Sequence, residues 1–205
     1  NIIIHCASLT NVDYCEENPD EAFAMNVNST QNLLDSIEND SCVKFIYIST
    51  DSVYGENEGP QQTENITSPC NVYGKTKLQG EKVVDGIPNS LILRTNIFGW
   101  NIQNKNSLGE WIIHELKQRN QIRGFKDAYF STIYTFELAR IIDVSIKKNI
   151  AGVYNCGSRD SCSKFDFAIK LADTFGFDRN LIKPISIDEH KFSGIRSKYL
   201  ILSVK

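Results

Sequence analysis

Short apolar runs rich in β-branched residues alternate with amphipathic segments through the first half of the chain. The runs at 2–6, 43–49 and 90–94 have the length and composition of buried strands. Between them, the pattern predicts one helix that begins at Asn18-Pro19 and another over 72–84. Strands that alternate with helices in this way favour a doubly wound parallel sheet, so the predicted fold class is α/β.

The apolar spacing within the helical segments predicts which residues face the core. The first helix is predicted to bury a stripe formed by Ala22, Met25, Leu33 and Ile37. In the second half, helices are predicted over 108–119, 134–147 and 164–175, with a short strand at 152–156. The polar segment 56–68 has no periodicity and is predicted to be a surface loop.

The composition of this 205-residue chain is that of an ordinary globular protein. Hydrophobic residues make up 41% of it, which is enough for a core, and its net charge is −3. Because Lys and Arg are dispersed, we expect no nucleic-acid partner. No apolar run has the length of a membrane span and no signal peptide is visible, so the expected location is the cytoplasm.

The histidines and cysteines do not have the spacing of a metal site. The three histidines are far apart in the sequence, so no metal site is predicted. The cysteines lack Cys-x-x-Cys spacing and are expected to be reduced thiols, several of them small core residues. They are Cys6, Cys15, Cys42, Cys70, Cys156 and Cys162.

Three polar residues form the strongest functional pattern: Thr50 at the end of a predicted strand, with Tyr73 and Lys77 one helical turn apart. A tyrosine has an unperturbed pKa of about 10, so alone it is a poor base at neutral pH. A lysine four residues later on the same helix face places a positive charge beside the phenol and favours the phenolate. The pattern predicts proton transfer at a carbon–oxygen centre, with the threonine hydroxyl holding the substrate oxygen.

The segments around these residues resemble the extended short-chain dehydrogenase/reductase family, in the sugar-nucleotide branch that includes dTDP-4-dehydrorhamnose reductase. Tyr47–Gly55 and Ser68–Lys77 carry the strand-end threonine and the Tyr-x-x-x-Lys pair. Ile4–Glu16 resembles the strand and loop beneath the nicotinamide, Asn26–Asn32 the helix that follows, and Arg94–Gly99 the strand end that meets the sugar nucleotide. The motifs occur in the family's order.

The resemblance implies a role for each matching residue. Tyr73 is the implied acid–base group, Thr50 orients the substrate oxygen, and Lys77 lowers the pKa of Tyr73 and holds the nicotinamide ribose. The residues implied to bind the cofactor, NADP or NAD, are Cys6, Ala7, Ser8, Thr10, Asn26, Tyr73 and Lys77. Those implied to bind the nucleotide-sugar substrate are Thr50, Asp51, Asn96, Ser131, Thr132 and Arg196.

Some of these residues keep a structural alternative. Asn26 could hold a proton-relaying water for Lys77, or it could be a helix residue that bonds to a loop backbone. Arg196 could contact the anionic diphosphate, or it could be a solvated side chain. Arg94 is expected to be a structural charge at a strand end.

One part of the family pattern is missing from the sequence. The family opens with a strand and a glycine-rich turn that receives the cofactor pyrophosphate at a helix N-terminus. The twelve glycines here form no such pattern, and the chain begins at the family's fourth strand. About 60 residues are therefore expected to be absent, from the usual length of βαβ units. The preference between NAD and NADP would be encoded in that part.

The resemblance also implies a division of the chain. Residues 1–99 and about 126–155 would form the remainder of a Rossmann-like NAD(P)-binding domain, truncated at its N-terminus. Residues from about 100 to 125 and 156–205 would form a small C-terminal substrate-binding lobe. A homodimer is compatible with this family.

The residue after Asp51 distinguishes reactions within the family. Sugar-nucleotide 4,6-dehydratases carry Thr-Asp-Glu because elimination needs an extra carboxylate base, whereas this chain has Ser52 there. The resemblance therefore implies an NAD(P)-dependent reductase of a nucleoside-diphosphate 4-keto-6-deoxy sugar. Two alternatives stay open: a sugar-nucleotide 4-epimerase, and a non-catalytic NAD(P)-binding regulatory subunit like that of methionine adenosyltransferase.

Overall fold

A four-stranded parallel sheet organises the larger part of the structure. Its strands lie in the order β1 (Ile2–His5), β2 (Lys44–Thr50), β3 (Leu91–Thr95) and β8 (Gly152–Cys156), and every pairing is parallel. The structure is a computed structural model that describes residues 1–37, 43–55, 59–63, 65–102 and 107–204.

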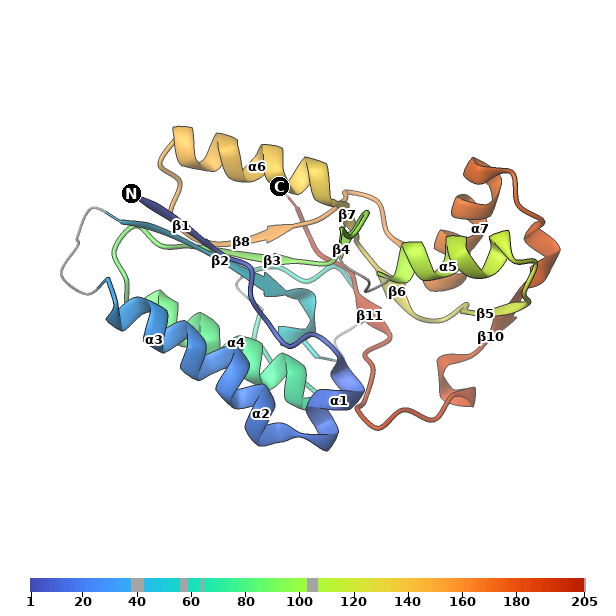
Figure 1. Cartoon of the computed structure of the whole chain (residues 1–205), viewed down its shortest axis with the longest axis horizontal. Helices are drawn as coiled ribbons and strands as arrows, with labels where there is room; N and C mark the ends of the chain where they lie inside the picture. The colour runs from blue at the N-terminus through green and yellow to red at the C-terminus, as the bar shows by residue number, and fades with distance from the viewer. Residues whose placement is uncertain (38–42, 56–58, 64, 103–106, 205) are drawn as a thin grey trace.

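Helices cover both faces of this sheet (Figure 1). One face packs against α3 (Ser29–Asp35) and α4 (Val72–Asp85), and the other against α6 (Thr135–Lys147). Because successive side chains of a strand point to opposite faces, Phe45 joins the core with α3 and α4, whereas Ile46 joins the core with α6. The predicted α/β fold with a doubly covered parallel sheet is confirmed.

The first helical region is not the single helix with one buried apolar stripe that the sequence predicts. It consists of α1 (Val12–Glu17), α2 (Pro19–Phe23) and a π-helical turn, Ala24–Asn28, which leads into α3. Met25 is 45% exposed, because the inward positions of the wider π turn are taken by its neighbours, Asn26 among them. The predicted burial of Met25 is therefore wrong. The prediction selected apolar residues at helical spacing, and this criterion cannot find a buried asparagine.

A smaller lobe lies beside the carboxyl ends of the sheet strands (Figure 1). Its two helices, α5 (Leu108–Lys117) and α7 (Lys164–Phe175), pack on a parallel pair formed by β5 (Ile122–Phe125) and β10 (Ile182–Ile185). One short 3₁₀ turn follows β2 at Asp51–Val53, and two lie in the lobe on either side of β10, at Arg179–Leu181 and Ile187–Glu189.

Short strands join the lobe to the body, which is the four-stranded sheet with the helices that cover it. β4 (Ile97–Phe98) pairs with β7 (Ile133–Tyr134), and β6 (Tyr129–Phe130) lies between β11 (Tyr199–Leu200) and β9 (Cys162–Ser163). The sequence division places β6 in the Rossmann part, but its partners and its phenylalanine belong to the lobe.

The last residues return to the body. Leu202 is 2% exposed, packs with Val53 and Tyr54, and pairs with Gln61. The segment predicted to be a substrate lobe from 156 onward thus ends against the sheet domain. The division into two domains stays a prediction.

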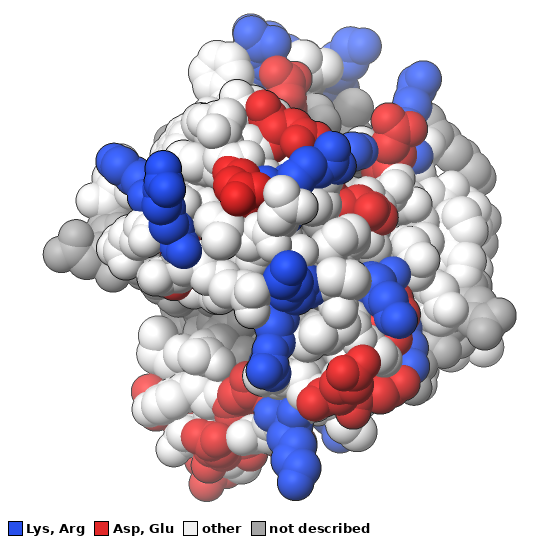
Figure 2. All heavy atoms as spheres, turned by 90° about the vertical axis from the view of Figure 1, so that its right-hand side faces the viewer, with Lys and Arg blue, Asp and Glu red and all other residues white. Residues whose placement is uncertain are grey.

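The described cysteines are free thiols, and Cys15 and Cys156 are buried as small core residues. Cys42 and part of the predicted loop 56–68 lie outside the described residues. On the face shown in Figure 2, Lys and Arg side chains are interspersed with Asp and Glu. Within the described ranges, no helix combines the length and apolarity needed to cross a membrane.

The close approach of α4 to the sheet generates a prediction about Gly80. A Cβ added to Gly80 would lie 2.2 Å from the Tyr47 hydroxyl and 3.0 Å from the backbone oxygen of Asn26. Alanine in a helix interior is usually about 0.5–1 kcal/mol more favourable than glycine. Here we expect Gly80→Ala to lower the free energy of unfolding by about 1–3 kcal/mol through overpacking, measured by urea denaturation.

Gly86, the C-cap of α4, provides the matched control. A Cβ added there meets no atom within 4 Å, so Gly86→Ala should leave stability unchanged or slightly raised. A Gly80→Ala protein as stable as the wild type would contradict the described packing of α4 on β2.

Candidate active site

A cleft of about 510 Å³ opens where β2 and β3 end, between the sheet and the lobe. Thr50 and Thr95 are register partners at these two ends. In open α/β sheets, ligands bind outside the carboxyl ends of the strands. The cleft brings together these residues singled out from the sequence: Cys6, Ser8, Thr10, Thr50, Asp51, Tyr73, Lys77, Asn96 and Arg196.

Tyr73 enters the cleft from the first turn of α4. Asn71 caps this helix by accepting a hydrogen bond from the Gly74 N–H at 2.8 Å, which fixes where the helix begins. Burial raises the pKa of Tyr73 to about 12, and a hydrogen bond with Thr50 opposes this rise while the Asp51 carboxylate adds to it. At neutral pH, Tyr73 is therefore a neutral phenol.

Lys77 lies one turn further along α4 and is 2% exposed. Its Nζ donates to the Ile48 backbone oxygen at 2.8 Å and lies 4.0 Å from the centroid of the Tyr47 ring. Burial lowers the pKa of Lys77 to about 8, although the Glu81 carboxylate opposes this. The pKa of Tyr73 lies above its ordinary value because the effect of burial on the phenol dominates, and the lowering of this pKa by Lys77 stays a prediction.

Asp51 and Asn96 tie the ends of β2 and β3 together. Asn96 Nδ2 donates to Asp51 Oδ2 at 2.7 Å, and Thr50 Oγ1 donates to Asp51 Oδ1 at 3.1 Å. Burial raises the pKa of Asp51 to about 6, while these hydrogen bonds lower it. The Ser52 N–H donates to Thr50 Oγ1 at 3.2 Å, so the threonine hydroxyl is held in a defined position.

A buried ion pair lies behind these residues. Arg94 Nη2 and Glu81 Oε2 are 2.7 Å apart, and both side chains are nearly inaccessible to solvent. Ser49 Oγ also donates to Glu81, and Arg94 Nη1 donates to the Tyr54 hydroxyl at 2.9 Å. Arg94 thus contacts protein groups, in line with its expected structural role.

Asn26 lies next to the cleft wall but does not line the cleft. Its Nδ2 donates to the Leu9 backbone oxygen and to Thr76 Oγ1, while its Oδ1 accepts from the Leu9 N–H and from Ser8 Oγ. These four bonds use both donors and both acceptor positions of the amide. The geometry favours the structural alternative, in which Asn26 holds the loop after β1.

Three further residues expected to bind ligands also lie outside the cleft lining. Ala7 is exposed in the loop after β1. Ser131 is fully buried, and its Oγ accepts from the Leu202 N–H. Thr132 Oγ1 donates to the Asn96 backbone oxygen at 3.0 Å, so it supports Asn96 from behind. Their ligand-binding roles stay predictions without direct geometric support.

The lobe adds cleft residues that the sequence did not single out, including Ser107, Leu108 and Lys164. Ser107 has a recognisable signal, because it forms a capping box with Glu110 at the start of α5. Lys164 has no such signal in the sequence. It is a single lysine at the start of a helix, and only the folded structure shows that it lines the cleft. Among the described residues, Lys164 forms no ion pair.

A second cavity, of about 460 Å³, adjoins the cleft. Leu108 and Lys164 line both spaces, so they stand at the boundary. The second cavity combines aromatic and polar side chains, which include Trp111, Phe125, His190, Phe192, Gln121 and Arg123.

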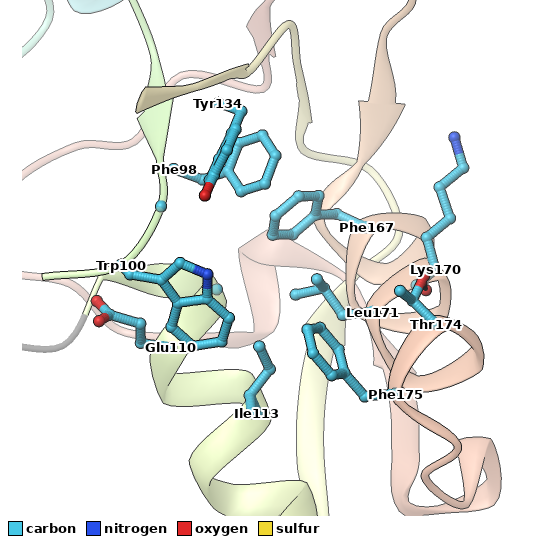
Figure 3. A pocket seen from close by; sticks show the side chains of 12 residues that line it. Phe98, Trp100, Glu110, Ile113, Tyr134, Phe167, Lys170, Leu171, Thr174 and Phe175 are labelled. Atoms are coloured by element: carbon cyan, nitrogen blue, oxygen red, sulfur yellow. Dashed lines mark hydrogen bonds between the residues drawn. The ribbon is translucent and has the colours of Figure 1, made fainter. Parts of the chain in front are cut away.

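A third cavity, of about 390 Å³, is separate from both and is walled by aromatic rings of the lobe (Figure 3). Trp100 and Phe175 meet edge to face there, 6.1 Å apart between ring centroids. None of the residues singled out from the sequence lines this cavity, so it is no part of the candidate site.

Comparison with known proteins shows the family. The model of the RmlD substrate binding domain matches residues 1–205, and the chain belongs to that family. The crystal structure of dTDP-4-dehydrorhamnose reductase from Bacillus anthracis, in complex with NADP, is 31% identical with a TM-score of 0.90. The match covers 100% of this chain and 72% of that one.

Two curated relatives are similar at lower coverage of their own length. A probable low-salt glycan biosynthesis reductase from Haloferax volcanii is 28% identical over 188 residues, which cover 89% of this chain and 62% of the relative. Methionine adenosyltransferase 2 subunit beta from Bos taurus is 28% identical over 200 residues, which cover 91% and 58%. The chain thus spans about three fifths of the length of these relatives.

The buried Asp51 carboxyl generates a prediction about stability and pH. Its pKa is about 6 in the folded protein against 3.8 for the free group, so between these pH values the folded state binds more protons. The free energy of unfolding should therefore fall as pH rises through this window. Asp51→Asn should flatten that part of the curve, measured by urea denaturation at a series of pH values.

Asp85→Asn, at the exposed end of α4, is the control and should leave the curve unchanged. An Asp51→Asn curve parallel to that of the wild type would show that this carboxyl is not buried as described.

Proposed function

We propose that the protein containing this chain is an NAD(P)H-dependent reductase that acts on the C4 carbonyl of a nucleoside-diphosphate 4-keto-6-deoxy sugar. The observation that carries the proposal is the convergence of Thr50, Tyr73 and Lys77 in one cleft, with Tyr73 held as a neutral phenol. Carbonyl reduction needs a proton donor at the oxygen, and a phenol with a pKa of about 12 is protonated at neutral pH. The same phenol can pass its proton to a more basic alkoxide.

The residues of the cleft divide this work. The Thr50 hydroxyl, positioned by the Ser52 N–H, would turn its proton from Asp51 to the carbonyl oxygen, and Tyr73 would donate its proton to that same oxygen. Lys77 would hold the ribose of the cofactor and keep a positive charge near the reacting centre.

The same cleft fits a nicotinamide cofactor. Cys6, Ser8 and Thr10 line the wall after β1 with small side chains, which leave room for a flat ring against the backbone. Bound NADPH or NADH would supply the hydride for C4. The NADP found in the Bacillus anthracis neighbour supports a nicotinamide cofactor here, and the choice between NADP and NAD stays open.

The adjoining cavity would receive the other half of a nucleotide sugar. Its aromatic walls, with Phe125 and Phe192 at a centroid distance of 5.7 Å, suit a flat base. With the sugar in the cleft and the nucleoside in this cavity, the ligand would cross the boundary at Leu108 and Lys164.

Similarity to methionine adenosyltransferase 2 subunit beta supports a second candidate, a regulatory subunit that binds a nicotinamide nucleotide. The residues of the cleft suit cofactor binding in either case. The 4-epimerase remains an alternative in which Tyr73 would act first as a base and then as an acid.

Turnover separates these candidates. We expect the intact protein to consume NADPH or NADH stoichiometrically with a dTDP-4-keto-6-deoxy sugar, followed by the near-ultraviolet absorbance of the reduced nicotinamide. Tyr73→Phe should lower kcat by about 10²–10⁴-fold, the usual contribution of general acid catalysis, with little change in KM.

Tyr154→Phe is the matched control, since Tyr154 is 45% exposed on β8 and does not line the cleft. Unchanged cofactor absorbance despite cofactor binding would leave two candidates, the regulatory subunit and a 4-epimerase, which regenerates its own cofactor. Wild-type turnover by Tyr73→Phe would remove Tyr73 as the acid.

A further inference from the structure

Two cationic side chains stand where the cleft meets the adjoining cavity. Lys164 lines both spaces, and its Nζ lies 6.0 Å from the ring centroid of Phe125. Arg196 lines the cleft, and its guanidinium carbon lies 4.7 Å from the ring centroid of Phe192. Both rings belong to the adjoining cavity, so each cation lies between a polar space and an aromatic one.

The two cations differ in their charge balance. Arg196 Nη2 is 2.6 Å from Asp13 Oδ2, so its charge is already paired. Lys164 has no ion-pair partner among the described residues, and it is attracted by Asp51 but repelled by Arg196. A partly buried ammonium without a close partner is costly, and an anion placed beside it would offset that cost.

Helix stability does not explain the lysine at this position. Lys164 is the first residue of α7, directly after the N-cap Ser163. A cation at a helix N-terminus is opposed by the helix dipole, which favours anions there. Asp166 in the first turn already complements the dipole, so the unpaired ammonium of Lys164 is what favours an anion at this boundary.

We propose that Lys164 is a substrate-binding residue that contacts the diphosphate of the nucleotide sugar and makes the protein selective for nucleoside diphosphates. This inference rests on the proposed function, because it takes the sugar to lie in the cleft and the nucleoside in the adjoining cavity. A ligand in both spaces crosses the boundary with its anionic link, which places the diphosphate next to Lys164. Arg196 would add a second cation on the cleft side.

Calorimetric titration of the intact protein with dTDP, UDP and dTMP tests this assignment. Lys164→Met keeps the apolar stem and removes the charge. We expect it to weaken dTDP or UDP binding about tenfold to a hundredfold, the usual effect of losing one hydrogen bond to a charged group. It should weaken dTMP binding less, and the loss should shrink at high salt. NADP binding should be unchanged, which shows that the variant is folded.

Lys170→Met is the matched control, because Lys170 lies on the same helix but lines the separate aromatic cavity shown in Figure 3. Two outcomes would overturn the inference: equal diphosphate affinity in Lys164→Met and wild type, or no nucleoside diphosphate binding by the wild type. A diphosphate affinity that depends on Lys164 supports the inference even if no sugar is reduced, so this test is separate from that of turnover.

Discussion

The helix α4 carries Tyr73 and Lys77, and its position depends on a buried ion pair. Glu81 on α4 meets Arg94 on β3 through three nitrogen–oxygen contacts of 2.7–3.2 Å, and Ser49 on β2 donates to the same carboxylate. A buried pair of this kind tolerates the loss of one partner poorly, because the other charge is then left unpaired in the core. Its value here is geometric, since it fixes α4 against two central strands.

Tyr73, Lys77 and Glu81 follow one another at intervals of four residues, so they share one face of α4. Lys77 and Glu81 are buried and Tyr73 is half-buried at the cleft wall. Removal from solvent disfavours charge on the first two residues of the series: the pKa of Tyr73 rises to about 12 and that of Lys77 falls to about 8. The helix therefore presents a neutral phenol to the cleft. This state suits proton donation in a reduction.

The sequence predicted what depends on local pattern and could not predict what depends on distant contacts. The strands, α4 and the Tyr-x-x-x-Lys pair follow from periodicity and spacing, and their meeting with Thr50 follows from parallel strand order. The inward position of Asn26 depends on a π turn and on the loop after β1, and the role of Lys164 depends on how the lobe folds back. The direction of the Tyr73 pKa shift depends on burial, which a Tyr-x-x-x-Lys pattern does not encode.

The protonation state of Tyr73 is the most direct test of the proposal that this residue is a proton donor. In protein labelled with ¹³C at tyrosine Cζ, comparison with Tyr73→Phe identifies the Tyr73 resonance, which can be followed between about pH 6 and 10 around the ordinary tyrosine pKa. We predict that Tyr73 stays protonated throughout this range, in line with a pKa of about 12. Ionisation with a midpoint near neutral pH would contradict the account and would favour a base in the cleft.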